Sequence, residues 1–196
     1  MYELKSARYV AAEIFRAVLE KGDRAIDATM GNGHDTETLC HLVGAEGRVY
    51  AFDIQEAAVA STRERLEAAG LLERAVLFHM GHEKMGEVVR EPVQLIAFNL
   101  GWLPGGDHQV TTRTETTLSA IRQALELLEP MGVLVICVYP GHPEGERERE
   151  AVTGMLRSLS PRAYNVLVHE FLNAGPGAPL CLVAQRQRGR GSEGEK

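Results

Sequence analysis

Cationic side chains are scarce in this chain of 196 residues. The sequence has 21 lysines and arginines against 27 aspartates and glutamates, and its formal net charge is −6. A protein that coats nucleic acid non-specifically needs many lysines and arginines to contact phosphates. The composition argues against that class, so any contact with RNA or DNA must use a local patch.

Long apolar runs are missing as well. No segment approaches the roughly 18 apolar residues that a membrane-spanning helix needs, and residues 1–15 lack the charged-then-apolar layout of a signal peptide. A chain of this length buries one core of ordinary size. We therefore expect a cytoplasmic protein without a membrane span, built as one domain over residues 1–185 with a flexible tail at 186–196.

Cysteine is also rare. Cys40, Cys137 and Cys181 are odd in number, widely spaced and placed inside apolar runs. This pattern argues against a disulfide framework and against a zinc site of the cysteine type, and it is compatible with a reducing compartment.

Strand-like and helix-like segments alternate along the chain. Apolar and β-branched runs predict strands at 24–29, 48–54, 75–79, 93–98, 132–139, 163–171 and 180–185. Helical spacing of apolar residues predicts helices at 9–19, 35–43, 55–69, 114–128 and 144–159. Such alternation is typical of a parallel sheet covered on both faces, and the last two strands have no helix between them. The sequence thus predicts an α/β fold: a Rossmann-like, seven-stranded, mostly parallel sheet with helices on both faces and an antiparallel edge hairpin.

A glycine turn follows the first strand. Gly31 and Gly33 stand in the segment 27–33, where glycine lets the backbone turn sharply and a ligand approach closely. Asp53 lies 20 residues past Gly33, at the end of the second strand, where a carboxylate can accept both hydroxyls of a ribose. Thr36 replaces the third glycine of dinucleotide-binding proteins, and no P-loop motif follows. The pattern resembles the first two motifs of class I S-adenosylmethionine-dependent methyltransferases; a nucleotide site or a turn without a ligand is the alternative.

A second candidate segment, 99–107, follows the fourth strand. It matches two of four positions of the Asn/Asp-Pro-Pro-aromatic motif of methyltransferases that act on exocyclic amines. The side-chain oxygen of Asn99 and the backbone carbonyl of Leu100 could accept the hydrogens of a primary amine and orient its lone pair, and Trp102 could stack on a base. The alternative is a loop rich in glycine and proline, with Trp102 as a filler.

Three histidines and one carboxylate also follow strands and are expected at the same rim: His34, His82, His142 and Glu83. They lack the H-x-x-x-H spacing of metal ligands, so we predict no metal site, although a metal-dependent hydrolase is a weaker alternative. His82 and Glu83 stand where class I methyltransferases contact adenine, and His142 stands on the substrate side. Arg113 is a candidate phosphate contact, whereas the charged segment 144–150 is typical of a solvated helix face.

Together, the segments 27–36, 50–55, 98–107 and 141–145 resemble a bacterial family of tRNA 5-(aminomethyl)-2-thiouridine methyltransferases, formerly described as rRNA methylases. The resemblance runs from about Lys5 to Arg186. It implies methyl transfer from S-adenosylmethionine to the aminomethyl group of the modified wobble uridine in the tRNA anticodon loop, and it implies a homodimer. Two residues depart from the family: Pro140 replaces a usual histidine, and Trp102 replaces a more common tyrosine.

The motifs and the resemblance give three sets of expected site residues. The expected cofactor contacts are Asp27, Met30, Gly31, Asn32, Gly33, His34, Asp35, Thr36, Asp53, Ile54, Gln55, His82, Glu83 and Asn99. The expected catalytic segment is Asn99, Leu100, Gly101 and Trp102. The expected substrate contacts are Trp102, Pro104, Gly105, Asp107, Arg113 and His142. The alternatives are an rRNA or small-molecule amine N-methyltransferase with the same cofactor, and a non-catalytic nucleotide-binding module.

Overall fold

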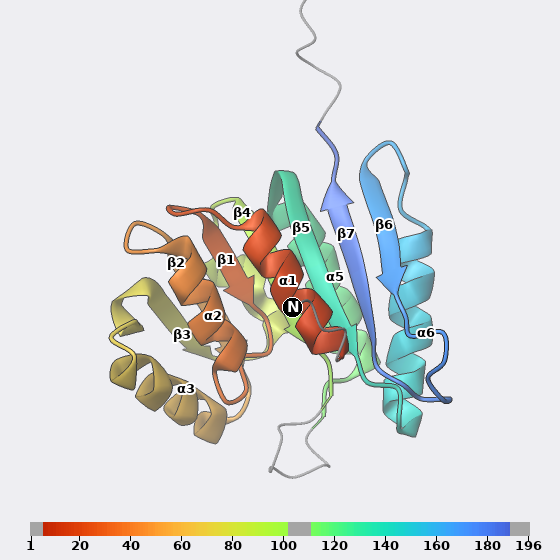
Figure 1. The fold of residues 1–196 in the computed structure, drawn as a ribbon, viewed down its shortest axis with the longest axis horizontal. Coiled ribbons are helices and arrows are strands. Elements are labelled where there is room, and N and C mark those ends of the chain that lie inside the picture. The colour runs from red at the N-terminus through yellow and green to blue at the C-terminus, as the bar shows by residue number, and fades with distance from the viewer. Residues whose placement is uncertain (1–5, 102–110, 189–196) are drawn as a thin grey trace, which may run out of the picture.

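The computed structural model describes residues 6–101 and 111–188 of the chain. Its centre is one seven-stranded sheet with the strand order β3-β2-β1-β4-β5-β7-β6 (Figure 1). The strands are β1 (Arg24–Asp27), β2 (Arg48–Asp53), β3 (Ala75–His79), β4 (Val93–Asn99), β5 (Leu128–Val138), β6 (Tyr164–His169) and β7 (Leu180–Arg186). The first five strands pair in parallel, and β7 pairs antiparallel with both β5 and β6. The predicted sheet and its antiparallel edge are confirmed.

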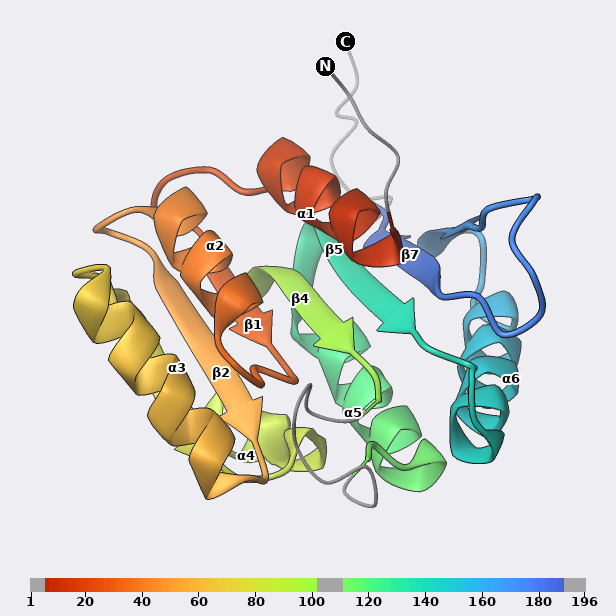
Figure 2. The ribbon, with the colours of Figure 1, turned by 60° about the horizontal axis from the view of Figure 1, so that its bottom comes forward.

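Helices cover both faces of this sheet, as Figure 2 shows. The helices are α1 (Ala7–Val18), α2 (His34–Val43), α3 (Glu56–Ala68), α4 (Met85–Val88), α5 (Thr114–Leu127) and α6 (Pro143–Arg157). The helices α1, α2 and α3 lie on one face, and α4, α5 and α6 lie on the other. Two short 3-10 turns, η1 (Leu72–Arg74) and η2 (His82–Lys84), flank β3. Within the described ranges, none of the helices is long and apolar enough to cross a membrane.

The central strands contribute side chains to two hydrophobic cores. In β4, Leu95 and Ala97 pack under α1 and α2, whereas Ile96 and Phe98 pack under α5 and α6. A strand buried on both faces needs an unbroken apolar run, because alternate side chains point to opposite faces. The three cysteines are buried free thiols, in agreement with the prediction that they form no disulfide framework.

Several boundaries differ from the predictions, among them those of β7 and β5. The tail was expected to begin at Arg186, but Arg186 is the last residue of β7, where its Nη1 donates to the Leu128 carbonyl, and Gln187 N donates to the Ala163 carbonyl at 2.7 Å. Arg186 and Gln187 are therefore anchored to neighbouring parts of the fold. The strand expected from 132 begins at Leu128, and Met131 (φ 71°) lies where its register with β4 shifts.

Candidate functional site

A cavity of about 750 Å³ opens at the carboxyl ends of β1, β2 and β4, the position where open α/β sheets place their ligands. Eleven of the expected cofactor contacts line it: Met30, Gly31, Asn32, His34, Asp35, Asp53, Ile54, Gln55, His82, Glu83 and Asn99. Leu100, Gly101 and Arg113 also line it. The structure places Asp27, Gly33, Thr36 and His142 outside the lining. Trp102, Pro104, Gly105 and Asp107 lie outside the described residues.

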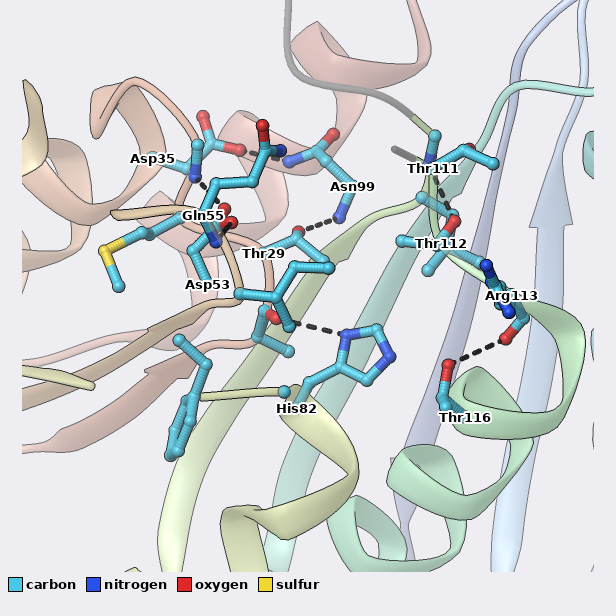
Figure 3. Close-up of a pocket in the computed structure, with 18 of the residues that line it drawn as sticks. Thr29, Asp35, Asp53, Gln55, His82, Asn99, Thr111, Thr112, Arg113 and Thr116 are labelled. Atoms are coloured by element: carbon cyan, nitrogen blue, oxygen red, sulfur yellow. Dashed lines mark hydrogen bonds between the residues drawn. The ribbon is translucent and has the colours of Figure 1, made fainter. Parts of the chain in front are cut away.

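The cavity has two sides, which Figure 3 shows facing each other across His82 and Asn99. The glycine-turn side consists of residues 30–32, 34–35 and 53–55, and the threonine side consists of residues 111–113 and Thr116. Sequence reasoning missed several lining residues, among them Arg8, Thr29, Phe52, Thr111, Thr112, Thr116 and Tyr139.

The glycine turn is held by backbone geometry and by α3. Gly31 (φ 50°) and Gly33 (φ 79°) both adopt the left-handed region that favours glycine. A Cβ at Gly33 would lie 2.9 Å from the backbone of Thr62, so glycine is also required for the packing of the turn against α3. Thr62 Oγ1 donates to the Gly31 carbonyl at 2.9 Å, and Arg65 Nε donates to the Asn32 carbonyl at 2.7 Å. Gly33 thus shapes the turn from behind, without reaching the cavity.

Asp27 supports the same turn from below. Its carboxylate is buried and accepts hydrogen bonds from Thr36 Oγ1 at 2.6 Å and from Thr29 N at 3.2 Å. Burial, reinforced by the charges of Asp35 and Asp53, raises the pKa of Asp27 to about 7. Asp27 and Thr36 therefore act on the cavity through the turn that they hold.

Asp53 ends β2 and faces the cavity from the glycine-turn side. Its Oδ2 accepts from Gly31 N at 3.1 Å and its Oδ1 from Gln55 N at 2.9 Å. A carboxylate has about four acceptor positions, so two are left for a ligand. The next side chain, Ile54, is 57% exposed and lines the cavity. A carboxylate beside an open apolar surface suits a ribose joined to an aromatic base.

His82 is a buried, neutral histidine at the floor of the cavity. Its Nδ1 lies 3.3 Å from the Ala28 carbonyl, and burial lowers its pKa. Because a carbonyl can only accept, Nδ1 must carry the hydrogen, and the neutral ring keeps a lone pair on Nε2. Figure 3 shows this ring between the two sides of the cavity. Nε2 can therefore accept a hydrogen bond from an amino group of a bound base.

Asn99 ends β4, and its carboxamide is fixed by two partners. Its Nδ2 donates to Asp35 Oδ2 at 2.5 Å, and Tyr139 Oη donates to its Oδ1 at 3.4 Å. Arg8 Nε and Nη2 both bond Asp35 Oδ1 at 3.1 Å. A carboxylate paired with arginine only accepts hydrogen bonds, so the Asn99 amino group must face Asp35. Its Oδ1 is left as the acceptor that a ligand in the cavity can use.

The threonine side is polar and carries one cation. The Thr111 hydroxyl oxygen is buried and has no hydrogen-bond partner among residues 6–101 and 111–188. Arg113 occupies the N-cap position before α5, and its side chain makes no capping hydrogen bond. Glu144 Oε1 instead accepts from Thr114 N at 3.0 Å and from Thr114 Oγ1 at 2.9 Å. His142 caps α6, where its Nδ1 accepts from Gly145 N at 3.2 Å. This role explains why His142 stands apart from the cavity.

The charge around the glycine turn discriminates between ligands. The carboxylates of Asp35 and Asp53 lie close enough to Asp27 to raise its pKa. A phosphate or pyrophosphate at this turn would be repelled by them, whereas a cationic ligand would be attracted. Across the described part of the chain, no group of three or more His, Cys, Asp or Glu residues could hold a metal ion.

Comparisons with known proteins agree with this geometry. Residues 49–185 match the model of a family described as "Putative rRNA methylase". A chloroplastic tRNA (mnm5s2U34)-methyltransferase of Arabidopsis thaliana is 44% identical over 192 residues, which cover 93% of this chain and 70% of that protein.

Two solved structures are similar over nearly the whole chain. A "putative rRNA-methylase" from Clostridium thermocellum is 35% identical with a TM-score of 0.92, covering 94% of this chain and 100% of that one. A "putative methyltransferase" from Streptococcus mutans, in complex with SAH, is 37% identical with a TM-score of 0.85, covering 94% and 99%. The chain therefore has the class I methyltransferase fold and belongs to the rRNA methylase family.

Proposed function

We propose that the protein transfers a methyl group from S-adenosylmethionine to the aminomethyl nitrogen of 5-aminomethyl-2-thiouridine at the wobble position of tRNA. The products are S-adenosylhomocysteine and 5-methylaminomethyl-2-thiouridine, which forms as its ammonium because the positive charge passes from sulfur to nitrogen. The observation that carries this proposal is the fixed carboxamide of Asn99, whose Oδ1 is presented as a neutral acceptor beside a turn surrounded by carboxylates. The name of the 44% identical plant relative supports the choice of substrate.

The glycine-turn side fits S-adenosylmethionine, which supplies a methyl group on a positively charged sulfur. The free acceptor positions of Asp53 suit the two ribose hydroxyls. Ile54 offers an apolar surface to the adenine ring, and His82 Nε2 offers an acceptor to its amino group. The carboxylates of Asp35 and Asp53, which line the cavity, favour the sulfonium charge. The SAH complex of the Streptococcus mutans relative supports this assignment.

Asn99 and Leu100 orient the acceptor amine. An alkylamine has a pKa of roughly 10, so in water it is mostly protonated and has no lone pair to offer. Burial beside a sulfonium charge favours its neutral form. Asn99 Oδ1 and the Leu100 carbonyl accept its two N–H groups, which leaves the lone pair directed at the methyl group. The remaining task is positioning, with nitrogen and carbon held roughly 3 Å apart.

The threonine side faces the tRNA. Arg113 is placed to contact a phosphate next to the target nucleotide, and the unpartnered Thr111 hydroxyl is placed to contact a sugar or base. Few phosphate contacts are needed to bind one pre-modified base in an anticodon loop, which makes a net charge of −6 tolerable. A tRNA substrate is consistent with a cytoplasmic enzyme.

The edge strand β6 supports the homodimer that the family resemblance implies. Val166, Leu167 and Val168 are 38%, 50% and 52% exposed, and Leu172 beyond them is 99% exposed. A row of exposed apolar side chains on an unpaired edge is suited to cover by a second copy. Sedimentation of the protein and of Leu167→Lys tests this: the variant should shift toward the monomer, and a wild-type monomer at micromolar concentration would refute the dimer.

The decisive experiment is in vitro methylation of tRNA from a strain that lacks this enzyme, followed by mass spectrometry of the nucleosides. We expect 5-aminomethyl-2-thiouridine to disappear and its N-methylated form to appear. Ribosomal RNA from the same strain is the parallel substrate, because the family description names rRNA. Methylation of rRNA with unchanged tRNA would replace the proposed substrate, and absence of S-adenosylmethionine binding by calorimetry would refute the enzyme itself.

A further inference from the structure

Helix α6 carries a buried carboxylate that lies outside the cavity. Glu148 is 1% exposed, although its neighbours along the helix are charged and the segment was predicted to be a solvated face. Its Oε1 accepts from Thr117 Oγ1 at 2.5 Å and its Oε2 from Thr112 Oγ1 at 2.7 Å. No lysine or arginine in the described ranges forms an ion pair with it, and burial raises its pKa. Burying a carboxyl group whose only hydrogen-bond partners are two hydroxyls lowers the stability of the fold. This cost indicates that Glu148 has a role other than stabilising the fold.

The hydroxyl of Thr112 connects Glu148 to the cavity wall. A threonine hydroxyl has a single hydrogen, and here that hydrogen is donated to Glu148. The oxygen is therefore left as an acceptor, and Gly101 N donates to it at 2.9 Å. Thr112 N in turn donates to the Gly101 carbonyl at 3.0 Å. Glu148 thus sets the direction of the hydroxyl, and Thr112 holds Gly101 at both of its backbone groups.

The backbone of Gly101 depends on these hydrogen bonds to keep one orientation. Its φ of 138° lies in the region that glycine adopts readily and other residues avoid, and a Cβ there would meet nothing within 4 Å. On the other side, Leu100 N donates to the Cys137 carbonyl at 2.9 Å. The peptide unit between Leu100 and Gly101 is therefore fixed at its N–H by Thr112, and the preceding N–H is fixed by β5.

The planarity of that peptide unit fixes the Leu100 carbonyl. In a trans peptide, the N–H and C=O groups point in opposite directions. Because the Gly101 N–H points to Thr112, the Leu100 C=O points to the opposite side of the chain. Among residues 6–101 and 111–188, none donates a hydrogen bond to this carbonyl. Within the described residues it is thus available to a ligand, and Leu100 lines the same cavity as the Asn99 carboxamide.

We propose that Glu148 is a positioning residue for methyl transfer: through the Thr112 hydroxyl it fixes the Leu100–Gly101 peptide, so that the Leu100 carbonyl accepts an N–H of the acceptor amine. The proposal rests on the proposed function, because it needs an amine in the cavity. It assigns a role to a residue that touches neither the cofactor nor the substrate.

The first test compares Glu148→Gln with Glu150→Gln, which changes an exposed carboxylate on the same helix. An amide offers one acceptor in place of two and adds a donor, so the directions of both threonine hydroxyls are no longer set. For Glu148→Gln we expect kcat on tRNA to fall about tenfold, S-adenosylmethionine affinity to stay within about twofold, and exchange of the Gly101 amide hydrogen to accelerate. Glu150→Gln should match the wild type in all three measurements.

The second test changes the hydroxyl itself. Thr112→Val removes it at nearly constant volume and should lower kcat and accelerate Gly101 exchange at least as much as Glu148→Gln does. Thr112→Ser keeps the hydroxyl and should recover most of that loss. If Glu148 acts through Thr112, the double variant Glu148→Gln/Thr112→Val should be no slower than Thr112→Val alone.

The outcomes separate this proposal from the proposed function. A lower unfolding temperature of Glu148→Gln with wild-type kcat and wild-type Gly101 exchange would reduce Glu148 to a structural role and overturn the proposal. Additive losses in the double variant would also overturn it. Gly101 exchange is measured without tRNA, so wild-type protein that methylates no tRNA would refute the proposed function, while the exchange rates would still decide whether Glu148 holds the peptide.

Discussion

The two sides of the cavity place negative charge differently. On the glycine-turn side, the carboxylate of Asp53 faces the ligand directly, with Asp27 and Asp35 close by. Next to the threonine side, the carboxylate of Glu148 is buried behind Thr112, and the groups left for a ligand are the neutral oxygens of Asn99 and Leu100. A full negative charge stabilises a cationic cofactor, whereas beside an amine it would stabilise the protonated form that cannot react. Under the proposed function, the site therefore offers charge to the methyl donor and dipoles to the methyl acceptor.

The largest effect is expected when the side-chain dipole that is proposed to face the amine is removed. Asn99→Ala should lower kcat by about 100-fold to 1,000-fold, in the range seen when one oriented polar group of an active site is lost. Its cofactor affinity should stay within a few fold, because Asp53 and His82 are untouched. Single-turnover methylation of tRNA and calorimetry with S-adenosylmethionine measure the two quantities. Collapse of cofactor binding would instead place Asn99 with the glycine-turn side.

A substitution on the glycine-turn side should instead weaken cofactor binding. Asp53→Ala should weaken S-adenosylmethionine binding by about 10-fold to 100-fold, since charge-assisted hydrogen bonds contribute roughly 1.5–3 kcal/mol. Asp53→Asn keeps one acceptor oxygen and should fall between the wild type and Asp53→Ala. Calorimetry measures the affinity, and the shift in unfolding temperature at saturating cofactor provides a second reading. Equal affinities of all three proteins would remove Asp53 from the cofactor site.

The same contrast explains how much could be predicted from the sequence. The sheet, its antiparallel edge and most element bounds follow from apolar patterns, and the glycine-turn side is made of residues close together in the chain. By contrast, the four-residue helix α4 carries no periodic signal. Arg8 reaches the cavity only because α1 packs beside α2, which nothing in its local sequence indicates.

Glu148 was predicted wrongly although a signal existed. Glu148, Val152 and Leu156 recur every fourth residue, and all three are buried on one face of α6. Because charged residues surround Glu148 in the sequence, the charge pattern outweighed this spacing and led to the prediction of a solvated helix face. Its partners, Thr112 and Thr117, lie more than 30 positions away, so the pairing is decided by tertiary packing.

A third prediction uses the pKa of Asp27, which burial raises from 3.8 to about 7. Between about pH 4 and pH 7, the folded state keeps a proton that the unfolded state has released, so this group makes the free energy of unfolding decrease as pH rises. Its contribution is at most about 1.4 kcal/mol per pH unit. Below pH 4 and above pH 7 both states carry the same charge on Asp27, and the slope from this group vanishes.

Asp27→Asn isolates that contribution. Denaturant unfolding of the variant and of the wild type between pH 4 and pH 8 gives the difference in free energy, which should change with pH inside the window and level off outside it. Glu64→Gln, at an exposed position of α3, is the control and should run parallel to the wild type. Parallel curves for Asp27→Asn would mean that Asp27 is ionised throughout, and the negative charge at the turn would then be larger than described.

The smallest effect is expected from breaking the pair between Arg8 and Asp35, which links the glycine-turn side to Asn99. Arg8 is half-exposed, and its hydrogen bonds to Asp35 link it to Asn99, the residue proposed to orient the amine. Arg8→Ala should therefore lower kcat about threefold to fivefold and leave cofactor affinity nearly unchanged. Arg16→Ala breaks an exposed pair with Glu13 on the same helix and should have no effect, since such pairs contribute about 0–1 kcal/mol. Kinetics of methylation at saturating cofactor measure both variants. A loss of cofactor affinity in Arg8→Ala that exceeds its loss of kcat would show that Arg8 and Asp35 serve the methyl donor, and the division of charge between the two sides would have to be redrawn at Asp35.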